Sequence, residues 1–331
     1  MSETRGTWGA GIIAGYGAKL LEFENQADET YTEANPMGVE SNKSTSIFKE
    51  KMTKKGRETI NGKTGVNELS LTNEREDYAN DDREPTYETQ LNPKKFTGGV
   101  TISEELRDDA DADIEGELSA AKDLKVSYAM TVNRHKWSVL NYGFTAQASL
   151  PEHLSFYGDG KAVYASDHPI KNSISSTTTQ DNDATVVFSE TNLETGLLAV
   201  RNQLNDRGML GAWGSGPMVL SVPIALEKTA KIVTKSTKRS GTGNNDMNVY
   251  YDGSLTLVST KWLGATATGG SDTAWHLCDS MRSPFIFLNR RGYTPDTWID
   301  PYNKDFRYDV SCRYIVGNKE WKGTWGSTGA G

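Results

Sequence analysis

The chain has 331 residues, a formal net charge of −8 at pH 7 and a hydrophobic share of 36%. The negative charge excludes an overall electrostatic attraction to nucleic acid or to an anionic membrane surface. The length allows two ordinary domains or one domain with large excursions, and the apolar share is below the roughly 45–50% of an average globular chain, so part of the chain must lie outside any core.

Cysteine usage and the N-terminal sequence predict a reducing compartment. Cys278 and Cys312 lie far apart in a chain that does not begin with a cationic and apolar leader. We therefore expect two free, packed thiols in a cytoplasmic environment. The segment WGAGIIAGYGAKLL is interrupted by glycines and is shorter than the ~20 apolar residues of a membrane span, so no segment is expected to cross a bilayer.

The first third of the chain is too polar to form a core of its own. Residues 23–99 contain 18 members of the set AVILMFWYC among 77 residues. Two charged stretches, residues 48–72 and 87–103, read as extended, and the turn-rich sequence NEREDYANDDREP separates them. They predict a long two-stranded flap. A lone hairpin of this kind is marginal in water, so the flap implies a supporting surface on a partner.

A very long helix is predicted next. It opens at TISEE, where Thr101 or Ser103 can cap the first turn and Glu104 can close a capping box. An apolar stripe then repeats at steps of three or four and extends to about residue 144, which predicts about 40 helical residues and a rod of roughly 60 Å. The stripe comprises Leu106, Ala110, Ile114, Leu118, Ala121, Leu124, Tyr128 and Val132, with Trp137, Leu140 and Phe144 as its extension.

The rest of the chain alternates helices and strands. A helix is predicted over residues 191–206, with Leu193, Leu197, Val200 and Leu204 on its inner face and Gly208 as its stop. The apolar alternation over residues 306–316, with one lapse at Ile315, predicts a strand with one buried face, followed by a turn at Asn318 and Lys319 into a terminal hairpin. Further strands are predicted at MVLSV, SLTLVST, WHLCD and SPFIFLN, and a further helix at IALEKTAKIVTKS.

No motif in the sequence specifies chemistry. GRETINGKT resembles a phosphate-binding loop, but five residues separate its glycines where the nucleotide cradle needs four, and the stretch before it is charged instead of a buried strand. None of the four histidines has a second histidine or cysteine at zinc-like spacing. In FYGDGKAVYASDHP, Asp159, Asp167 and His168 are possible ligands of a divalent metal, but the sequence favours their holding a loop. We predict no catalytic, cofactor-binding or metal-binding residue.

The arrangement of a polar arm, a charged flap, a very long helix, an α/β region and a returning strand resembles the major capsid proteins of tailed bacteriophages, which have the Hong Kong 97-like fold. The local blocks LSFYGDGKAVYASDHP, TNLETGLLAVRNQLNDRG, GPMVLSVPIALEKTAKIV, SLTLVSTKWL and TAWHLCD look like successive blocks of Mu-type major head subunits. FRYDVSCRYIVGNKEW resembles the closing strands of that family. The resemblance covers residues 101–321, while the first 100 residues match mainly in layout.

The resemblance implies an α+β Hong Kong 97-like fold. Its parts would be an N-terminal arm at 1–47, an extended β-hairpin loop at 48–100, a peripheral domain with the spine helix at 101–190, an axial domain at 191–298 and closing strands of the peripheral domain at 299–331. Phe48, Tyr78, Tyr87 and Phe96 are the candidate inter-subunit contacts, because aromatic residues tend to dominate interface energy. For Tyr78, Tyr87 and Phe96, local pairs across the hairpin are an equally open interpretation.

The resemblance also implies a function: a major head protein that self-assembles into hexamers and pentamers of an icosahedral shell around double-stranded DNA. Its location would be the virion capsid, assembled in the cytoplasm of the host bacterium. The expected partners are further copies of the chain, a separate scaffolding protein, a portal, a possible decoration protein and DNA held by weak non-specific contact, with no membrane and no cofactor. A separate scaffold is expected because no cleavable scaffolding region of domain length precedes the subunit.

Two alternatives stay open at this point. One is an encapsulin-type compartment shell, which shares the fold but encloses an enzyme. The other, from a different class, is a metal-dependent hydrolase that uses Asp159, Asp167 and His168.

Overall fold

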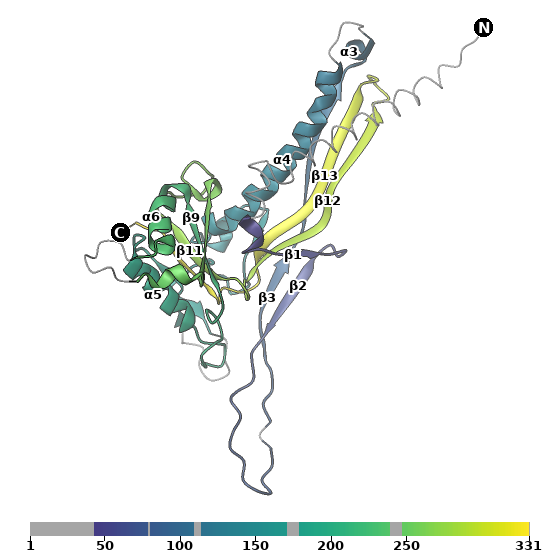
Figure 1. Cartoon of the computed structure of the whole chain (residues 1–331). Helices are drawn as coiled ribbons and strands as arrows, with labels where there is room; N and C mark the ends of the chain where they lie inside the picture. Colours follow the sequence, from purple (N-terminus) through teal and green to yellow (C-terminus); the bar gives the residue numbers. More distant parts are fainter. Residues whose placement is uncertain (1–42, 79, 109–113, 171–178, 239–246, 331) are drawn as a thin grey trace, which may run out of the picture.

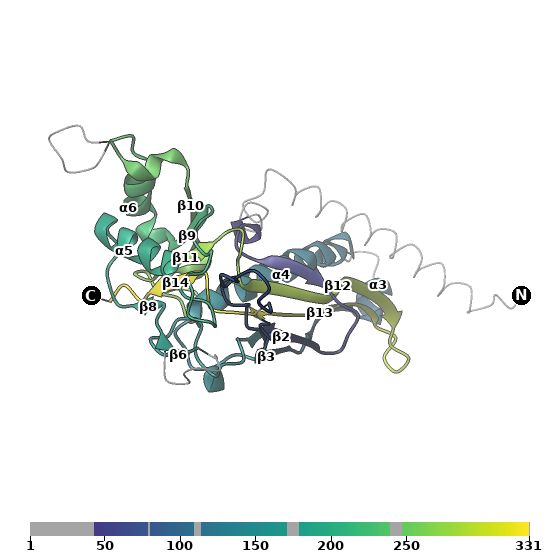
Figure 2. The same cartoon turned by 90° about the horizontal axis from the view of Figure 1, so that it is seen from below.

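The computed structural model describes residues 43–78, 80–108, 114–170, 179–238 and 247–330. It has two lobes, each built on a five-stranded sheet, and a long loop that extends away from both (Figure 1). Seen from below, the two lobes lie side by side (Figure 2). The class is therefore α+β, as predicted.

The first lobe is a sheet covered on one face by the long helix. The strand order is β1-β12-β13-β4, with β5 also paired to β13. β1 runs parallel to β12, and β12, β13 and β4 are antiparallel. The bounds are Lys49–Met52 for β1, Lys94–Ile102 for β4, Leu154–Ser155 for β5, Phe285–Ile299 for β12 and Phe306–Asn318 for β13.

Strand β13 has the burial that its sequence predicts. Phe306, Tyr308, Val310, Cys312 and Tyr314 are buried, and the residues between them are half-buried. The lapse at Ile315 has a structural reason, because this side chain packs on the opposite face with Leu91, Ile286 and Leu288. At this end of the strand both faces of the sheet are covered.

The predicted long helix is present as α3 (Glu104–Asp108) and α4 (Ile114–Asn141). The backbone N–H of Leu106 donates to Ser103 Oγ at 3.2 Å, which confirms Ser103 as the capping residue. The 28 residues of α4 span about 42 Å. Trp137 and Leu140 from its second half are buried in the largest core cluster, and Phe144, which lies beyond the helix, packs against that cluster. Residues 109–113, where a continuous rod would join the two helices, lie outside the described ranges.

The second lobe is a sheet in the order β10-β9-β11-β14-β8, packed against α5 and α6. Its bounds are Asp183–Ala184 for β8, Glu190–Arg201 for α5, Met218–Pro223 for β9, Ile224–Lys235 for α6, Leu255–Thr260 for β10, Trp275–Asp279 for β11 and Thr324–Ser327 for β14. Shorter elements are η1 (Gln147–Ser149), β6 (His168–Pro169), β7 (Thr179–Gln180), η2 (Val249–Asp252) and η3 (Lys261–Leu263). The strands predicted at MVLSV, SLTLVST and WHLCD and the helix at IALEKTAKIVTKS are confirmed.

The helix predicted over residues 191–206 ends earlier than expected. Leu193, Leu197 and Val200 are buried as predicted, but α5 stops at Arg201 and Leu204 forms an isolated bridge with Leu210. Gly208 lies in the following turn and does not stop the helix. The reason is Asn205, whose side-chain oxygen accepts hydrogen bonds from the backbone N–H groups of residues 207 and 209 and so fixes a turn.

The predicted terminal hairpin is wrong. β14 does not return along β13; it pairs antiparallel with β11 and parallel with β8 in the other sheet. The buried side chain of Asn318 directs this crossing, because its oxygen accepts from the backbone N–H of Tyr157 at 3.1 Å and its amide donates to the carbonyl of Glu320 at 2.9 Å. The hairpin partner of β13 is β12, which is much longer than the predicted run SPFIFLN.

One core cluster joins the two lobes. It includes Trp137 of α4, Phe285 of β12, Val219 of β9 and Val258 of β10. Cys278 and Cys312 are free and buried, as expected. Among the described helices, none combines the length and the apolar character that crossing a membrane requires.

Candidate inter-subunit surfaces

The predicted flap is a hairpin with a long, unpaired end. We call residues 58–91 the extended loop: β2 (Glu58–Lys63) pairs antiparallel with β3 (Pro85–Leu91), and residues 64–84 project beyond them (Figure 1). The flap is shorter than predicted, because β1 and β4, which also lie in the two charged stretches, belong to the sheet of the first lobe.

The base of the extended loop is firmly attached to the body. The buried carboxylate of Glu58 accepts from Lys51 Nζ at 2.5 Å and from Thr53 Oγ1 at 3.1 Å. These two hydrogen bonds, that of Lys51 first, lower the pKa of Glu58. On the other strand, the backbone N–H of Gly158 donates to Thr89 Oγ1, and a Cβ at Gly158 would lie 1.8 Å from the carbonyl oxygen of Glu88. Only glycine allows this close approach of the two backbones.

Arg207 holds the neck of the loop against the second lobe. Its Nε donates to the carbonyl of Gly65 at 3.3 Å, and its guanidinium also contacts the carbonyl of Asp82 and the carboxylate of Asp81, the latter at 3.3 Å. The buried Thr64 closes the neck through two hydrogen bonds with Glu84. The backbone N–H of Thr64 donates to the carbonyl of Glu84, and the backbone N–H of Glu84 donates to Thr64 Oγ1, each at 2.9 Å. Sequence reasoning missed Arg207, because a single arginine in a turn carries no pattern.

The end of the extended loop exposes apolar side chains. Leu69 is 100% exposed, Leu71 97% and Tyr78 88%. The acidic residues Glu68, Glu74, Glu76 and Asp77 lie between and beside them and are also exposed. Large apolar side chains gathered on a projecting segment are typical of a surface that a partner covers.

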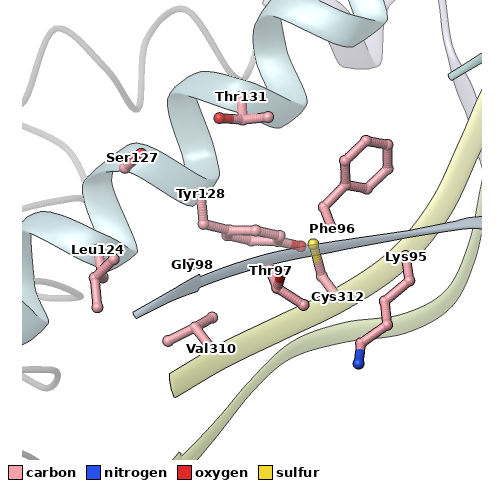
Figure 3. Close-up of a pocket in the computed structure, with 10 residues that line it drawn as sticks. All are labelled: Lys95, Phe96, Thr97, Gly98, Leu124, Ser127, Tyr128, Thr131, Val310 and Cys312. Carbon is pink, nitrogen blue, oxygen red and sulfur yellow. The ribbon is translucent and has the colours of Figure 1, made fainter. Parts of the chain in front are cut away.

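An apolar groove of about 350 Å³ lies between α4 and the strands β4 and β13. In Figure 3, Leu124 and Tyr128 reach from the helix towards Gly98 on β4 and Val310 on β13. Cys312 forms part of the wall, and burial raises the pKa of its thiol to about 11, so it is protonated at neutral pH. Apart from Lys95 the lining of the groove is neutral at this pH, with apolar side chains interspersed with the hydroxyl groups of Thr97, Ser127 and Thr131.

A basic hollow of about 610 Å³ lies beside the groove. Its lining carries five cations, Lys94, Lys95, Arg290, Arg291 and Arg313, together with Pro93. Lys94 pairs with Glu152 at 3.2 Å. For the other four cations, no carboxylate oxygen of the described residues lies within ion-pair distance. Lys95 lines both the groove and the hollow, so the two surfaces are continuous.

The structure does not bring the four predicted contact residues together. Phe48 is 3% exposed and packs against Trp137 and Phe285 inside the subunit. Phe96 stacks on Tyr314 with ring centroids 4.6 Å apart and also walls the groove.

The other two predicted residues belong to the extended loop. Tyr87 is half-buried and meets Tyr157 edge-on at 5.8 Å, so its ring partner is not on the opposite strand β2. Tyr78 alone among the four offers almost its whole side chain to solvent. Contact between subunits remains a prediction for all of them.

The stretch FYGDGKAVYASDHP, residues 156–169, is called the YGDG loop below, and its two aspartates have different partners. His168 Nδ1 lies 2.7 Å from Asp159 Oδ2, both side chains are buried, and the imidazole stacks on Trp321 with centroids 4.4 Å apart. Asp167 is exposed and pairs with Lys161. Over the described ranges, no group of three or more His, Cys, Asp or Glu side chains is placed to hold a metal ion. The geometry fits the loop-holding interpretation.

His135 and His153 pack against each other. His135, which lies on α4, is buried: its Nδ1 lies 2.8 Å from the hydroxyl of Tyr314, and its ring stacks on the half-buried His153 at 3.8 Å. Burial, with a smaller contribution from the neighbouring His153, lowers the pKa of His135 to about 3. Such a neutral imidazole acts as a core side chain at neutral pH.

A family model and solved structures match this chain. The family model described as "Phage capsid protein" matches residues 86–326. A comparison with curated proteins gives no match. Among solved structures, the capsid of Ralstonia phage GP4 is similar at 10% identity with a TM-score of 0.53, covering 86% of this chain and 87% of that one.

Two more solved structures are similar at the same level. The mature capsid of bacteriophage PhiM1 has 11% identity and a TM-score of 0.52 and covers 85% of this chain and 84% of that one. The capsid of cyanophage P-SCSP1u has 9% identity and a TM-score of 0.51, with 85% of each chain covered. At these identities the likeness establishes a shared fold.

Proposed function

The chain belongs to the phage capsid protein family, and from that premise we propose how its parts build a shell. Its fold is the Hong Kong 97-like fold of tailed-phage capsid subunits. It is a major capsid protein, a structural subunit of the virion and not an enzyme. Neither the encapsulin-type compartment nor the metal-dependent hydrolase is favoured.

The observation that carries the assembly proposal is the extended loop. Its base and neck are fixed by Glu58, Thr64 and Arg207, whereas its end exposes Leu69 and Leu71 almost completely. A segment that is anchored at one end and exposes leucines at the other is stabilised when a neighbouring subunit covers it. In the assembly we propose, each subunit lays this loop over the next one in the ring.

We assign the first lobe, with α4 as its spine, to the peripheral domain and the second lobe to the axial domain around the centre of each ring. We propose two changes to the domain limits predicted from the sequence, both supported by the strand pairing. β12 lies within 191–298 but pairs in the first-lobe sheet, and β14 lies within 299–331 but pairs in the second-lobe sheet. The N-terminal arm proposed at 1–47 lies largely outside the described residues.

As the finer family assignment we propose a Mu-type major head subunit. The support for it is the YGDG loop, because the buried pair of Asp159 with His168 supplies a structural reason for a "GdG" sequence followed nine residues later by a histidine. The glycine before Asp159 has a reason as well, since its backbone touches that of Glu88.

Rings of six and five subunits would close into an icosahedral shell around double-stranded DNA, because the same patches can meet repeatedly at slightly different angles. Many modest interfaces would act together, and avidity makes the assembled shell far tighter than any single contact. The proposed partners are a separate scaffolding protein, a portal and a decoration protein, and the proposed place of assembly is the cytoplasm of the host bacterium. The net charge of −8 limits the interior to weak, non-specific contact with DNA.

The test is expression of the full chain, alone and together with its scaffolding protein, followed by negative-stain microscopy and sedimentation. Closed shells of uniform size are expected in at least one of the two conditions. A chain that stays a monomer in both, at every concentration and salt condition, would overturn the proposal.

A further inference from the structure

The exposed leucines of the extended loop lie in a strand-like pattern. In the run Glu68-Leu69-Ser70-Leu71, polar and apolar side chains alternate. When such a run is extended, its leucines point to one side and Glu68 and Ser70 to the other. No strand of the described residues pairs with this run. It therefore has the side-chain pattern of a half-buried strand without a sheet to lie on.

A free sheet edge is present in the same chain. β4 is the last strand of the first-lobe sheet, and within the described ranges it pairs with β13 alone. Most of its residues are exposed. An exposed edge presents unpaired N–H and C=O groups that readily accept another extended segment.

The surroundings of this edge match the two sides of the loop segment. On the helix side, the groove walled by Leu124, Tyr128 and Phe96 can receive apolar side chains. On the opposite side, Lys95 leads into the basic hollow with Arg291 and Arg313. A strand added to β4 would therefore place the leucines against apolar walls and Glu68 near cations.

The loop cannot reach the β4 edge of its own subunit. Figure 1 shows it extending away from the body in the direction opposite to α3, whereas the groove lies along α4 towards α3. The neck is fixed by Arg207 and Thr64, so the loop has no hinge there. The partner that fits is a second copy of the chain.

We propose that the segment around Glu68, Leu69 and Leu71 of one subunit adds as a strand to the β4 edge of a neighbouring subunit, with the leucines in the groove and Glu68 facing Lys95 and the basic hollow. The inference rests on the proposed function, since it names the surface that receives the loop.

The decisive experiment is disulfide crosslinking in assembled shells. Leu69→Cys or Leu71→Cys is combined with Thr131→Cys, which lines the groove on α4. The matched control is Met130→Cys, an exposed neighbour on the same helix that does not line the groove. Single-cysteine variants run in parallel identify any crosslink through the buried Cys278 or Cys312.

At least one groove pair is expected to give crosslinked chains on a non-reducing gel after mild oxidation, and the Met130→Cys pairs are expected to give none. If shells form normally and no groove pair crosslinks, another occupant, such as residues 1–42, fills the groove and the inference fails. The major capsid function would be unaffected by that result, because the shells themselves establish it.

Charge reversal tests the proposed contact between Glu68 of one subunit and Lys95 of its neighbour. Glu68→Lys and Lys95→Glu are each expected to lower the yield of shells several-fold, and the double variant is expected to recover most of the loss. A double variant that is as poor as the two single losses combined would overturn the facing of Glu68 and Lys95.

Filling the groove tests the apolar side without touching the loop. A Cβ at Gly98 would meet Leu124 Cδ2 at 3.5 Å, an ordinary contact, so Gly98→Val should leave the free subunit folded while blocking the leucines. Thr101→Val on the same strand is the control, because residue 101 does not line the groove. Normal assembly of Gly98→Val with an unchanged melting temperature would contradict the placement of the leucines.

Discussion

Leucine side chains are buried in β9 and β11 of the second lobe and exposed at the end of the extended loop. In the second lobe, all residues of β9 and β11 are buried, and Leu277 has no exposed surface. In the loop, Leu69 is fully exposed. Burial of a leucine side chain is worth roughly 1.5–3 kcal/mol, so the lobe gains this free energy on folding and the loop can gain it only on assembly. Folding stability and assembly energy are thus carried by different regions of one chain.

The largest effect is expected from removing the end of the loop. Residues 65–83 are replaced by Asn-Gly, which closes the hairpin where Thr64 and Glu84 already pair at 2.9 Å. We expect a soluble, folded subunit with a melting temperature close to that of the full chain, and a complete loss of shells by negative-stain microscopy.

If the shortened subunit still forms normal particles, the extended loop contributes no free energy to assembly, and the proposed division between folding and assembly is wrong. A shortened subunit that melts far below the full chain would show that the loop also stabilises the fold, through the contacts of Arg207.

The second prediction compares one side chain from each region. Trp325 packs against Trp275 in the core of the second lobe with ring centroids 4.7 Å apart, so Trp325→Ala is expected to destabilise the free subunit by about 3–5 kcal/mol. Leu71→Ala removes an exposed side chain and is expected to change the stability of the free subunit by less than about 0.5 kcal/mol while lowering the yield of shells. Denaturant unfolding of the free subunit and sedimentation of the assembled particles separate the two quantities. A Leu71→Ala variant that unfolds as easily as Trp325→Ala would contradict the division.

Most regular elements could be predicted from the sequence, because periodicity reports which side of an element is buried. β9, β11 and the alternating part of β13 lie where their patterns indicate, and Ser103 caps the helix as its position predicts. The errors fall where a distant side chain decides. The path after Asn318 depends on its bond to Tyr157, and the end of α5 depends on the turn held by Asn205.

The candidate surfaces were predictable in part for the same reason. A core-poor segment indicates that something must cover it, and this inference needs only composition. The basic hollow combines Lys94, Lys95, Arg290, Arg291 and Arg313 from three strands, and no local pattern links these positions. Phe48 was selected for its aromatic side chain alone, and its packing against Trp137 and Phe285 was not predictable because those residues come from other parts of the chain.

The third prediction concerns acid stability, which should come from the lobes and not from the loop. His276 of β11 is buried, its Nδ1 has no hydrogen-bond partner among the described residues, and burial lowers its pKa to about 3. Below the ordinary pKa of about 6.5 the unfolded chain binds a proton that the folded subunit does not, so stability falls as the pH is lowered from 6.5 towards 3.

His276→Phe should remove this contribution, which amounts to about 2 kcal/mol at pH 5, and so flatten the acid side of the stability curve. Phe144 and Tyr164 surround the site with aromatic rings, so a phenyl group fits there. Denaturant unfolding at several pH values measures the slope, and part of the slope should remain because the buried His135 and the half-buried His153 also have lowered pKa values. An unchanged slope would mean that His276 is accessible to protons in the folded subunit.

The smallest effect is expected within the YGDG loop, where Asp159 is buried and Asp167 is exposed. Asp167 is exposed and pairs with Lys161, and exposed pairs contribute little, so Asp167→Asn should change the free energy of unfolding by less than about 0.5 kcal/mol. Asp159 is buried against His168, and its replacement by Asn weakens a buried hydrogen bond at an expected cost of about 1–3 kcal/mol. Thermal unfolding with and without a chelator measures both. If the two aspartates instead held a metal together, the two substitutions would cost similar amounts and the chelator would abolish the difference between each variant and the unmodified chain. If Asp159 and His168 alone hold the loop, Asp159→Asn should cost more stability than Asp167→Asn, and the chelator should not change this difference.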